Sequence, residues 1–170
     1  MSKSLAQKFP FLKLVVRDFA ELQEPFNEGL PSDLISRVSF EPGNLFSQQR
    51  AQRADVFFLR HILHDWPDTA AIKILRNIVN AQDGLLRDGT RIIIADSVIP
   101  PPGTLPQPLE RLITSLDLHM WCALNAGERT KDAWIDLFKT ADERLEVKAF
   151  VQPEGSADTL IELVFRHSKD

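Results

Sequence analysis

The sequence predicts an α/β protein built on a doubly wound, mostly parallel sheet that ends in an antiparallel hairpin. Two observations support this fold class. Strand-like apolar runs alternate with segments of helical periodicity along the chain. The last two runs, at residues 145–151 and 159–165, are joined by a short connection containing Pro153-Glu154-Gly155, which favours antiparallel pairing.

The first part of the chain is expected to contain a helix end, a buried strand that terminates in Asp18, a loop with a short helical piece, and a second strand. Proline and glycine residues interrupt any regular pattern in the loop and close the second strand. These four segments fall at residues 1–10, 13–18, 22–36 and 37–40.

The central part of the chain predicts a strand at 55–59, a helix, and a strand at 91–96 that is apolar throughout and ends in Asp96. Pro67 suits the first turn of the helix, because its φ angle is already helical and its missing N–H is not needed there. Apolar residues then recur at helical spacing, as in a helix packed on a sheet. These residues are Ala71, Ile74, Leu75 and Ile78.

A proline-rich loop at residues 100–108 is expected to be stiff and to help wall a pocket. Helical periodicity returns at 109–122 and again at 130–140, where Thr130 is suited to cap the helix. Strands and helices in this order predict a Rossmann-like sheet.

Composition and charge narrow the class of protein. With 170 residues, 44% of them hydrophobic, and a net charge of -4, the chain is expected to form a soluble globular domain. The mild acidity and the lack of a Lys/Arg-dense run argue against a nucleic-acid partner. One cysteine, Cys122, and no apolar run of membrane-spanning length predict a reducing, cytoplasmic location without a membrane partner.

The most informative segment is residues 55–68, where an apolar strand stops at His64-Asp65-Trp66 and a helix starts. In open α/β sheets ligands bind at the carboxyl ends of strands, so His64 is placed for chemistry. The alternative is that Asp65 caps the helix beside a packed histidine. The string FFLRHILHDWPD, followed by KILRN, resembles the signature of the plant and fungal O-methyltransferases that use S-adenosylmethionine.

The resemblance implies a catalytic group of one histidine and two acids. His64 matches the family's general base, and a neutral histidine suits that task because its ordinary pKa lies near working pH. The flanking acids fall on Asp96 and Glu128, and such an acid can orient the imidazole and stabilise its charged form. Without the resemblance, Asp96 would be interpreted as a loop-capping carboxylate and Glu128 as a solvated charge.

The resemblance also implies S-adenosylmethionine as the cofactor. Asp18 takes the role of the acid that binds the ribose hydroxyls. Asn44 and Leu45 fall against the adenine, and Arg60 stands where the family often has a lysine near the cofactor. Many members have an acid at the position of Asn44, whose amide oxygen can still accept the adenine amino hydrogen bond, without a charge.

Three further expectations concern the surroundings of His64. Parallel strand ends share one side of a sheet, so Asp18, His64 and Asp96 are expected on one face. A metal site is a weak interpretation, because His61, His64 and Asp65 are close in sequence but no further ligands converge. A small hydroxylated substrate is expected in an aromatic-lined pocket, with core packing as the alternative role of each candidate. The candidates are Trp66, Met120, Trp121, Leu124 and Asn125.

The resemblance runs from residue 6 to residue 165, but two family features are absent from the sequence. Family members carry a glycine-rich loop after a first strand and, before it, a helical dimerisation domain. We therefore expect residues 1–170 to form a truncated methyltransferase catalytic domain that lacks the first strand. The facing edges of the apolar strands at 14–16 and 56–58 are then expected to be either unpaired or forced together.

Two functions from different classes remain open. The first is an O-methyltransferase acting on a hydroxyl of a small aromatic or polyketide-like metabolite, either in this short form, as a homo-oligomer, or completed by a partner chain. The second is a non-catalytic remnant or accessory subunit without a complete cofactor site. A nicotinamide dehydrogenase is disfavoured, because the sequence has no Gly-x-Gly loop and no tyrosine.

Overall fold

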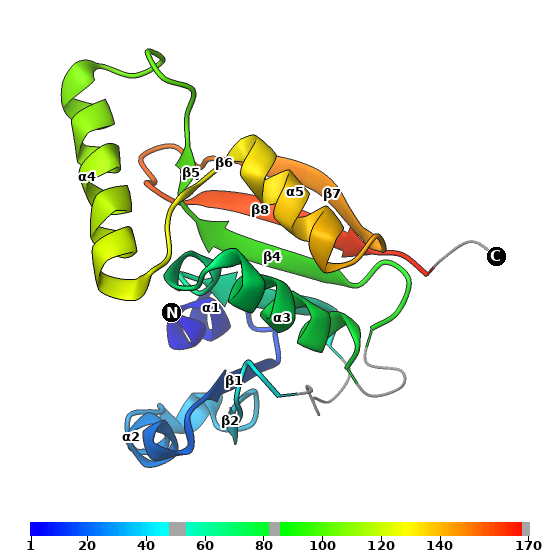
Figure 1. Ribbon diagram of the computed structural model, residues 1–170. Helices are drawn as coiled ribbons and strands as arrows, with labels where there is room; N and C mark the ends of the chain where they lie inside the picture. Colours follow the sequence, from blue (N-terminus) through cyan, green and yellow to red (C-terminus); the bar gives the residue numbers. More distant parts are fainter. Residues whose placement is uncertain (48–53, 82–85, 168–170) are drawn as a thin grey trace. The chain divides into compact units, whose positions relative to one another are not determined.

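The computed structural model describes residues 1–47, 54–81 and 86–167 (Figure 1). The chain divides into two compact units, Met1–Ser47 and Gln48–Asp170, which are described separately. Strands and helices alternate along the chain as the sequence predicts, which confirms the α/β class. Across the described residues, no helix combines the length and the apolar character needed to cross a membrane.

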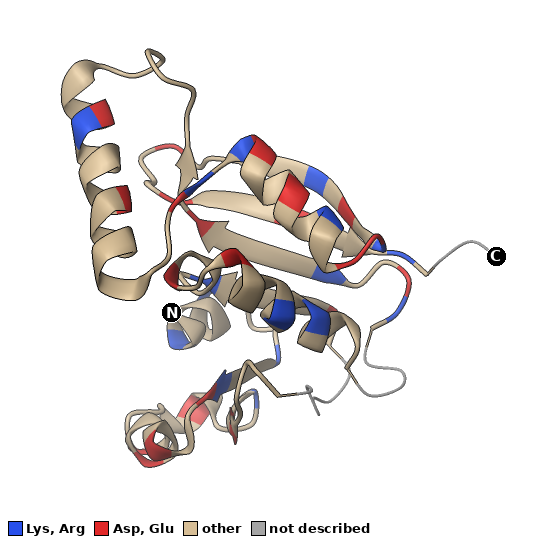
Figure 2. Ribbon diagram, viewed as in Figure 1, with Lys and Arg blue, Asp and Glu red and all other residues tan. Residues whose placement is uncertain are grey.

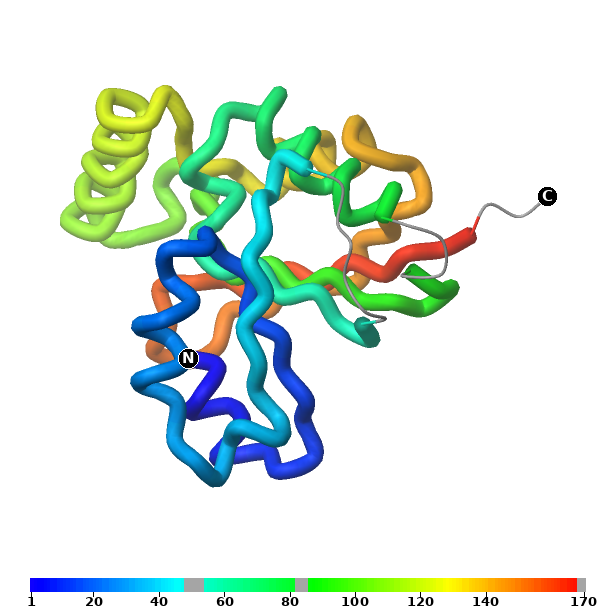
Figure 3. The backbone as a smooth tube through the Cα atoms, turned by 90° about the horizontal axis from the view of Figure 1, so that it is seen from below, coloured from blue at the N-terminus to red at the C-terminus, as the bar shows by residue number. Residues whose placement is uncertain are grey.

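The first unit contains two parallel strands and short helical segments. β1 (Leu14–Asp18) and β2 (Val38–Pro42) lie side by side in parallel register (Figure 3). Its buried core is small, with Ala6, Leu34 and Val38 at the centre. The helical segments are α1 (Ser2–Lys8), η1 (Ala20–Leu22), α2 (Gln23–Glu28) and η2 (Ser32–Leu34). They are short because proline and glycine interrupt this part of the sequence.

The second unit is built on a four-stranded sheet in the order β3-β4-β8-β7. β3 (Val56–Arg60) and β4 (Arg91–Asp96) are parallel. β8 (Thr159–Phe165) runs antiparallel to both β4 and β7 (Leu145–Val151), which confirms the predicted C-terminal hairpin. The parallel pair brings the carboxyl ends of β3 and β4 together, and the residues that follow these ends form the candidate site.

Two amphipathic helices cover one face of this sheet (Figure 1). α3 (Asp68–Val79) buries the apolar positions that the sequence spacing marks, with Pro67 as its N-cap residue. α5 (Lys131–Ala141) buries Trp134 and Phe138, whose rings stack. The side chain of Thr130 accepts a hydrogen bond from the backbone N–H of Ala133, so the predicted cap is confirmed.

α4 (Gln107–Leu124) has no buried residue, whereas α3 and α5 each bury an apolar face. Its surface carries few charges (Figure 2) and exposes several large apolar side chains. It ends at Asn125, which has a left-handed backbone with φ 51°. On either side of α4, β5 (Val98–Ile99) and β6 (Arg129–Thr130) pair in parallel. Two-residue strands have no readable periodicity, so sequence reasoning missed them.

The two strands whose edges were expected to be unpaired or forced together have a single strand neighbour each. Among the described residues β1 pairs only with β2, and β3 pairs only with β4. Val15, Val56 and Phe58 are exposed. Each of these strands thus has one unpaired edge within the described residues, and a missing first strand stays a prediction.

Candidate active site

His64 lies in a tight turn directly after β3. The chain leaves the strand at His61, which has a left-handed backbone with φ 51°, an uncommon conformation for a residue with a side chain. A 3-10 turn, η3 (Leu63–Asp65), follows, and Leu63 buries its side chain completely. The turn thus holds the His64 imidazole at the carboxyl end of the strand, with 16% of its side chain exposed.

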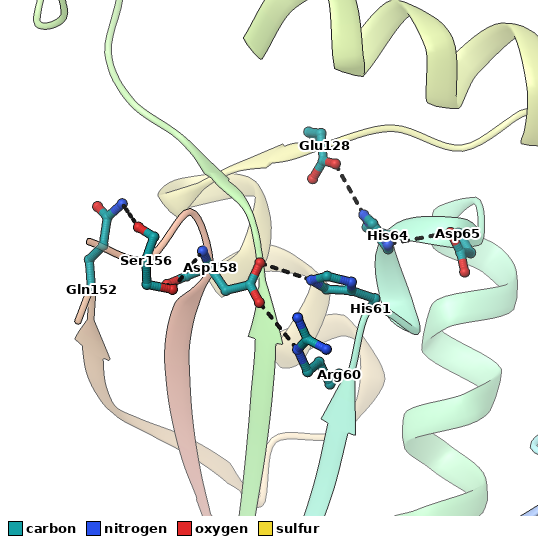
Figure 4. A network of polar contacts seen from close by, with 8 residues as sticks. All are labelled: Arg60, His61, His64, Asp65, Glu128, Gln152, Ser156 and Asp158. Carbon is teal, nitrogen blue, oxygen red and sulfur yellow. Dashed lines mark hydrogen bonds and ion pairs between the residues drawn. The ribbon is translucent and has the colours of Figure 1, made fainter. Parts of the chain in front are cut away.

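Glu128 contacts the imidazole from a distant part of the chain (Figure 4). Its Oε1 lies 3.0 Å from His64 Nδ1, and only 6% of the Glu128 side chain is exposed. The backbone N–H of Glu128 donates to Asp117 Oδ1 at 2.8 Å, which ties this segment to α4. Glu128 is therefore a buried partner of His64, and the alternative of a solvated charge does not describe it.

Asp96 ends β4 and is completely buried. Among the residues that the structure describes, neither of its carboxylate oxygens has a hydrogen bond of ordinary geometry, so Asp96 does not cap a loop there. Burial raises the pKa of Asp96 to about 6, because desolvation disfavours the charged carboxylate. The positive charge of a protonated His64 opposes this rise, and a weak interaction with the His64 backbone N–H is among the smallest causes that lower the pKa.

The pKa of His64 is raised above its ordinary value of 6.5. The hydrogen bond to Glu128 is the largest cause, burial opposes it, and the negative charges of Asp96, Glu128 and Asp65 add to the rise. A carboxylate can only accept, so Nδ1–H donates to Glu128 and the neutral ring keeps its lone pair on Nε2. Asp65 Oδ1 lies 3.4 Å from Nε2, where it stabilises the ring once this nitrogen is protonated.

Asp158, in the connection between β7 and β8, is a further member of this region that sequence reasoning missed. Its two carboxylate oxygens contact His61 Nε2 at 2.8 Å and Arg60 Nε at 3.3 Å (Figure 4). The Ser156 hydroxyl accepts from the Asp158 backbone N–H. No local pattern connects an aspartate near the C-terminus with a strand end almost a hundred residues earlier. Among the described residues, no cluster of three or more His, Cys, Asp or Glu side chains could hold a metal ion.

The cofactor residues expected from the sequence are divided between the two units. Asp18 Oδ1 accepts from the backbone N–H of Phe19 at 2.9 Å. Asn44 Oδ1 accepts from the backbone N–H of Phe46 at 2.8 Å, so this amide oxygen already stabilises its own turn. Leu45 is half-buried, and these residues lie in the first unit, whereas Arg60 lies in the second. The common face of Asp18, His64 and Asp96 stays a prediction.

A shallow hollow lies at the end of α4 and is lined by residues 121–125, whereas the expected aromatic-lined pocket stays a prediction. Three of the candidate residues, Trp121, Leu124 and Asn125, line the hollow. Trp121 is 65% exposed, so it is not a core side chain. Trp66 and Met120 lie outside this hollow, and Trp66 is also exposed.

Fold and geometry together describe a mixed α/β protein with a largely buried histidine–carboxylate group at its strand ends. Comparison with known proteins agrees with that class. Residues 1–142 match the family model for the O-methyltransferase domain. The O-methyltransferase pgmB of Aspergillus terreus is 40% identical over 164 residues, covering 94% of this chain and 45% of that protein. The chain therefore belongs to the O-methyltransferase family.

Solved structures resemble the chain at lower identity. The complex of LepI with SAM is 29% identical, with a TM-score of 0.79 over 96% of this chain and 39% of that one. A structure described as a pericyclic reaction enzyme matches with the same identity, TM-score and coverage. The chain spans less than half the length of these relatives.

Proposed function

We propose that this chain carries the general-base half of an S-adenosylmethionine-dependent O-methyltransferase. The observation that carries the proposal is the buried 3.0 Å contact between His64 Nδ1 and Glu128 Oε1, beside the unpaired carboxylate of Asp96. A protein that served only as a scaffold would gain nothing from burying three titratable groups together, because desolvating them costs stability. Membership of the O-methyltransferase family supports the same reaction class.

The residues of the first unit fit an adenosine cofactor in part. Asp18 Oδ1 accepts from the N–H of Phe19, and the Asp18 side chain is exposed. A carboxylate presented in this way can accept from the two ribose hydroxyls. Asn44 is the residue proposed to lie against the adenine, and its amide oxygen also accepts from the N–H of Phe46. S-Adenosylmethionine, when bound, supplies an electrophilic methyl group.

His64 acts in this proposal as the base that removes the proton of the substrate hydroxyl. Glu128 fixes the tautomer, so the lone pair on Nε2 is the acceptor. When Nε2 takes the proton, the negative charges of Asp65 and Glu128 stabilise the resulting imidazolium. A positioned base of this kind accelerates a reaction by about 10²–10⁴-fold.

The proposed substrate is a hydroxyl of a small aromatic or polyketide-like metabolite. The hollow at the end of α4 supports this class, because Trp121 presents an exposed ring and Leu124 an apolar side chain beside the polar Asn125. Apolar walls with a few polar groups are typical of sites for small organic molecules. We further propose that the active form is a homo-oligomer or is completed by a partner chain.

The test is methyl transfer to a panel of phenolic compounds, with the chain alone and with candidate partner chains. Mass spectrometry should show products that gain one methyl group, and isothermal titration should show binding of S-adenosylhomocysteine. His64→Gln should abolish most of the transfer, whereas His167→Gln, a change at an exposed histidine, should leave it unchanged. Lack of both binding and transfer under all conditions would favour a non-catalytic accessory protein instead. Products rearranged without a methyl gain would point to the chemistry of the pericyclic relative.

A further inference from the structure

Arg129 is a buried arginine that contacts the backbone on both sides of His64. Its side chain is 7% exposed. Nη1 donates to the carbonyl oxygen of Leu63 at 2.9 Å, and Nη2 donates to that of Trp66 at 2.8 Å. These two carbonyls bracket His64 in the sequence. The guanidinium therefore holds the turn that carries the imidazole at two points.

The remaining contacts of Arg129 connect that turn to α3 and α5. Nε donates to Asp68 Oδ1 at 2.9 Å, at the first residue of α3. The guanidinium carbon lies 5.0 Å from the centre of the Trp134 ring in α5. All three guanidinium nitrogens thus have partners, which is how a buried arginine offsets its desolvation.

The turn itself has little to fix its position. η3 is only three residues long, and no side chain caps its N-terminus. Short 3-10 segments are weakly stable by themselves, so tertiary contacts must determine where such a turn lies. Besides the buried side chain of Leu63 and the contact of Glu128 with the His64 ring, Arg129 contributes two hydrogen bonds to the backbone of this segment.

We propose that Arg129 is a positioning residue that sets His64 against Glu128, so that two adjacent residues divide the task. Glu128 orients the imidazole ring, and Arg129 holds the backbone from which the ring extends. The proposal deepens the proposed function, because it assumes that His64 is the base. It adds a residue that touches no reacting atom and acts only through His64.

The variant Arg129→Lys tests this role. Lysine keeps the positive charge, but a single ammonium cannot reproduce the planar fork that spans two carbonyls and a carboxylate. Arg76→Lys is the matched control. Arg76 also donates to two backbone carbonyls, those of Thr140 and Ala141, at the other end of α5. A loss of helix anchoring is thus common to both variants, and only Arg129→Lys should affect His64.

The primary measurement is NMR titration of the His64 imidazole in the 170-residue chain, assigned with His64→Gln. The groups that face this ring are Asp65 on its own turn, Asp96 from β4, Glu128, and the His61 ring at 5.3 Å. We expect the pKa of His64 to fall toward 6.5 in Arg129→Lys, because the Glu128 hydrogen bond loosens, and to stay at the wild-type value in Arg76→Lys. An unchanged pKa in a folded Arg129→Lys chain overturns the proposal.

A second variant covers the case in which Arg129→Lys does not fold. Arg129→Gln carries no charge, so it avoids burying an ammonium group with fewer partners, and its single short amide cannot span both carbonyls. It should lower the pKa of His64 in the same direction as Arg129→Lys. If thermal melting shows a folded Arg129→Gln chain whose His64 titrates as in wild type, Arg129 has no positioning role.

Kinetics separate this inference from the proposed function. In a form that transfers methyl groups, Arg129→Lys should lower kcat by up to about 100-fold, as displacements near 1 Å do, while KM for the cofactor stays constant. Arg76→Lys should change neither value. Absence of methyl transfer in every wild-type form contradicts the proposed function, whereas the NMR titration still decides whether Arg129 positions His64.

Discussion

The two compact units of this chain hold their candidate functional residues in different ways. In the first unit, Asp18 and Asn44 are stabilised by backbone N–H groups one or two residues away, and both side chains are exposed. In the second unit, His64 and Glu128 meet across 64 residues of sequence and are mostly buried. Local turns build the first set, whereas tertiary packing builds the second.

The difference follows from the size of the two cores. The core of the first unit is centred on three buried residues of modest size. The second unit buries large side chains from α3, α5 and the sheet, among them Trp134, Phe138 and Ile94. Only a core of that kind can hold carboxylates away from water, because the stability lost by desolvation must be offset by apolar burial. Substitutions in the second unit should therefore change pKa values and stability, and those in the first should change mainly cofactor affinity.

The largest effect should come from His64→Ala in a form of the protein that transfers methyl groups. Turnover should fall by about 10²–10⁴-fold with little change in cofactor affinity, because the base acts on the substrate hydroxyl. Asp18→Ala should show the reverse pattern, with weaker binding of S-adenosylhomocysteine by calorimetry. Equal losses of affinity in the two variants would contradict the division of roles between the units.

Asp96→Asn should stabilise the chain in a pH-dependent manner. The pKa of Asp96 is raised from 3.8 to about 6, so the folded chain favours the protonated form of this carboxyl group more strongly than the unfolded chain does. Its contribution to stability is fully present below 3.8 and is lost as pH rises through about 6. Near pH 8, Asp96→Asn should gain about 1–3 kcal/mol in the free energy of unfolding, since the buried charge is removed.

Urea unfolding near pH 8 and near pH 4 measures this dependence. The gain in the free energy of unfolding should be nearly absent at about pH 4. Asp18→Asn serves as the control from the first unit and should change the unfolding free energy by less than about 0.5 kcal/mol at either pH. A gain that is equal at both pH values would show that Asp96 does not titrate as its burial implies.

Glu128→Gln should lower the pKa of His64, because it removes both the charged hydrogen-bond acceptor and a nearby negative charge. The raised pKa of His64 stabilises the folded chain fully below 6.5, and this contribution disappears as pH rises through the folded pKa. In Glu128→Gln, the rise of methyl transfer with pH should therefore begin at lower pH. Titration of the imidazole by NMR checks the shift, and an unchanged midpoint would exclude the proposed dyad.

The smallest effect concerns the cap of α5. Thr130→Ala removes the acceptor of the Ala133 N–H and should lower the free energy of unfolding by about 1 kcal/mol. Thr114→Ala is a matched control in the exposed α4, where the hydroxyl donates only to the carbonyl of Glu110. The denaturant midpoint should fall further in Thr130→Ala than in Thr114→Ala. Similar midpoints would mean that the cap contributes little to the second unit.

Local pattern by itself determined where most elements lie. The spacing of apolar residues located α3, and the bounds of β7 and β8 coincide with the predicted strands at 145–151 and 159–165. These elements could be predicted because the periodicities of two residues in a strand and 3.6 residues in a helix are visible in the sequence itself. The position of His64 at the end of β3 followed from the same reading.

The tertiary structure alone decided which of these residues meet. Apart from the family resemblance, nothing near Glu128 in the sequence shows that its carboxylate contacts His64. No local pattern shows that Asp96 lacks a hydrogen bond of ordinary geometry among the described residues, or that Asp158 bridges Arg60 and His61. Arg129 is a similar case, because its partners at residues 63, 66 and 68 become neighbours only when β6 packs beside the turn. Such contacts depend on the packing of elements that are distant in sequence, and no local period encodes that packing.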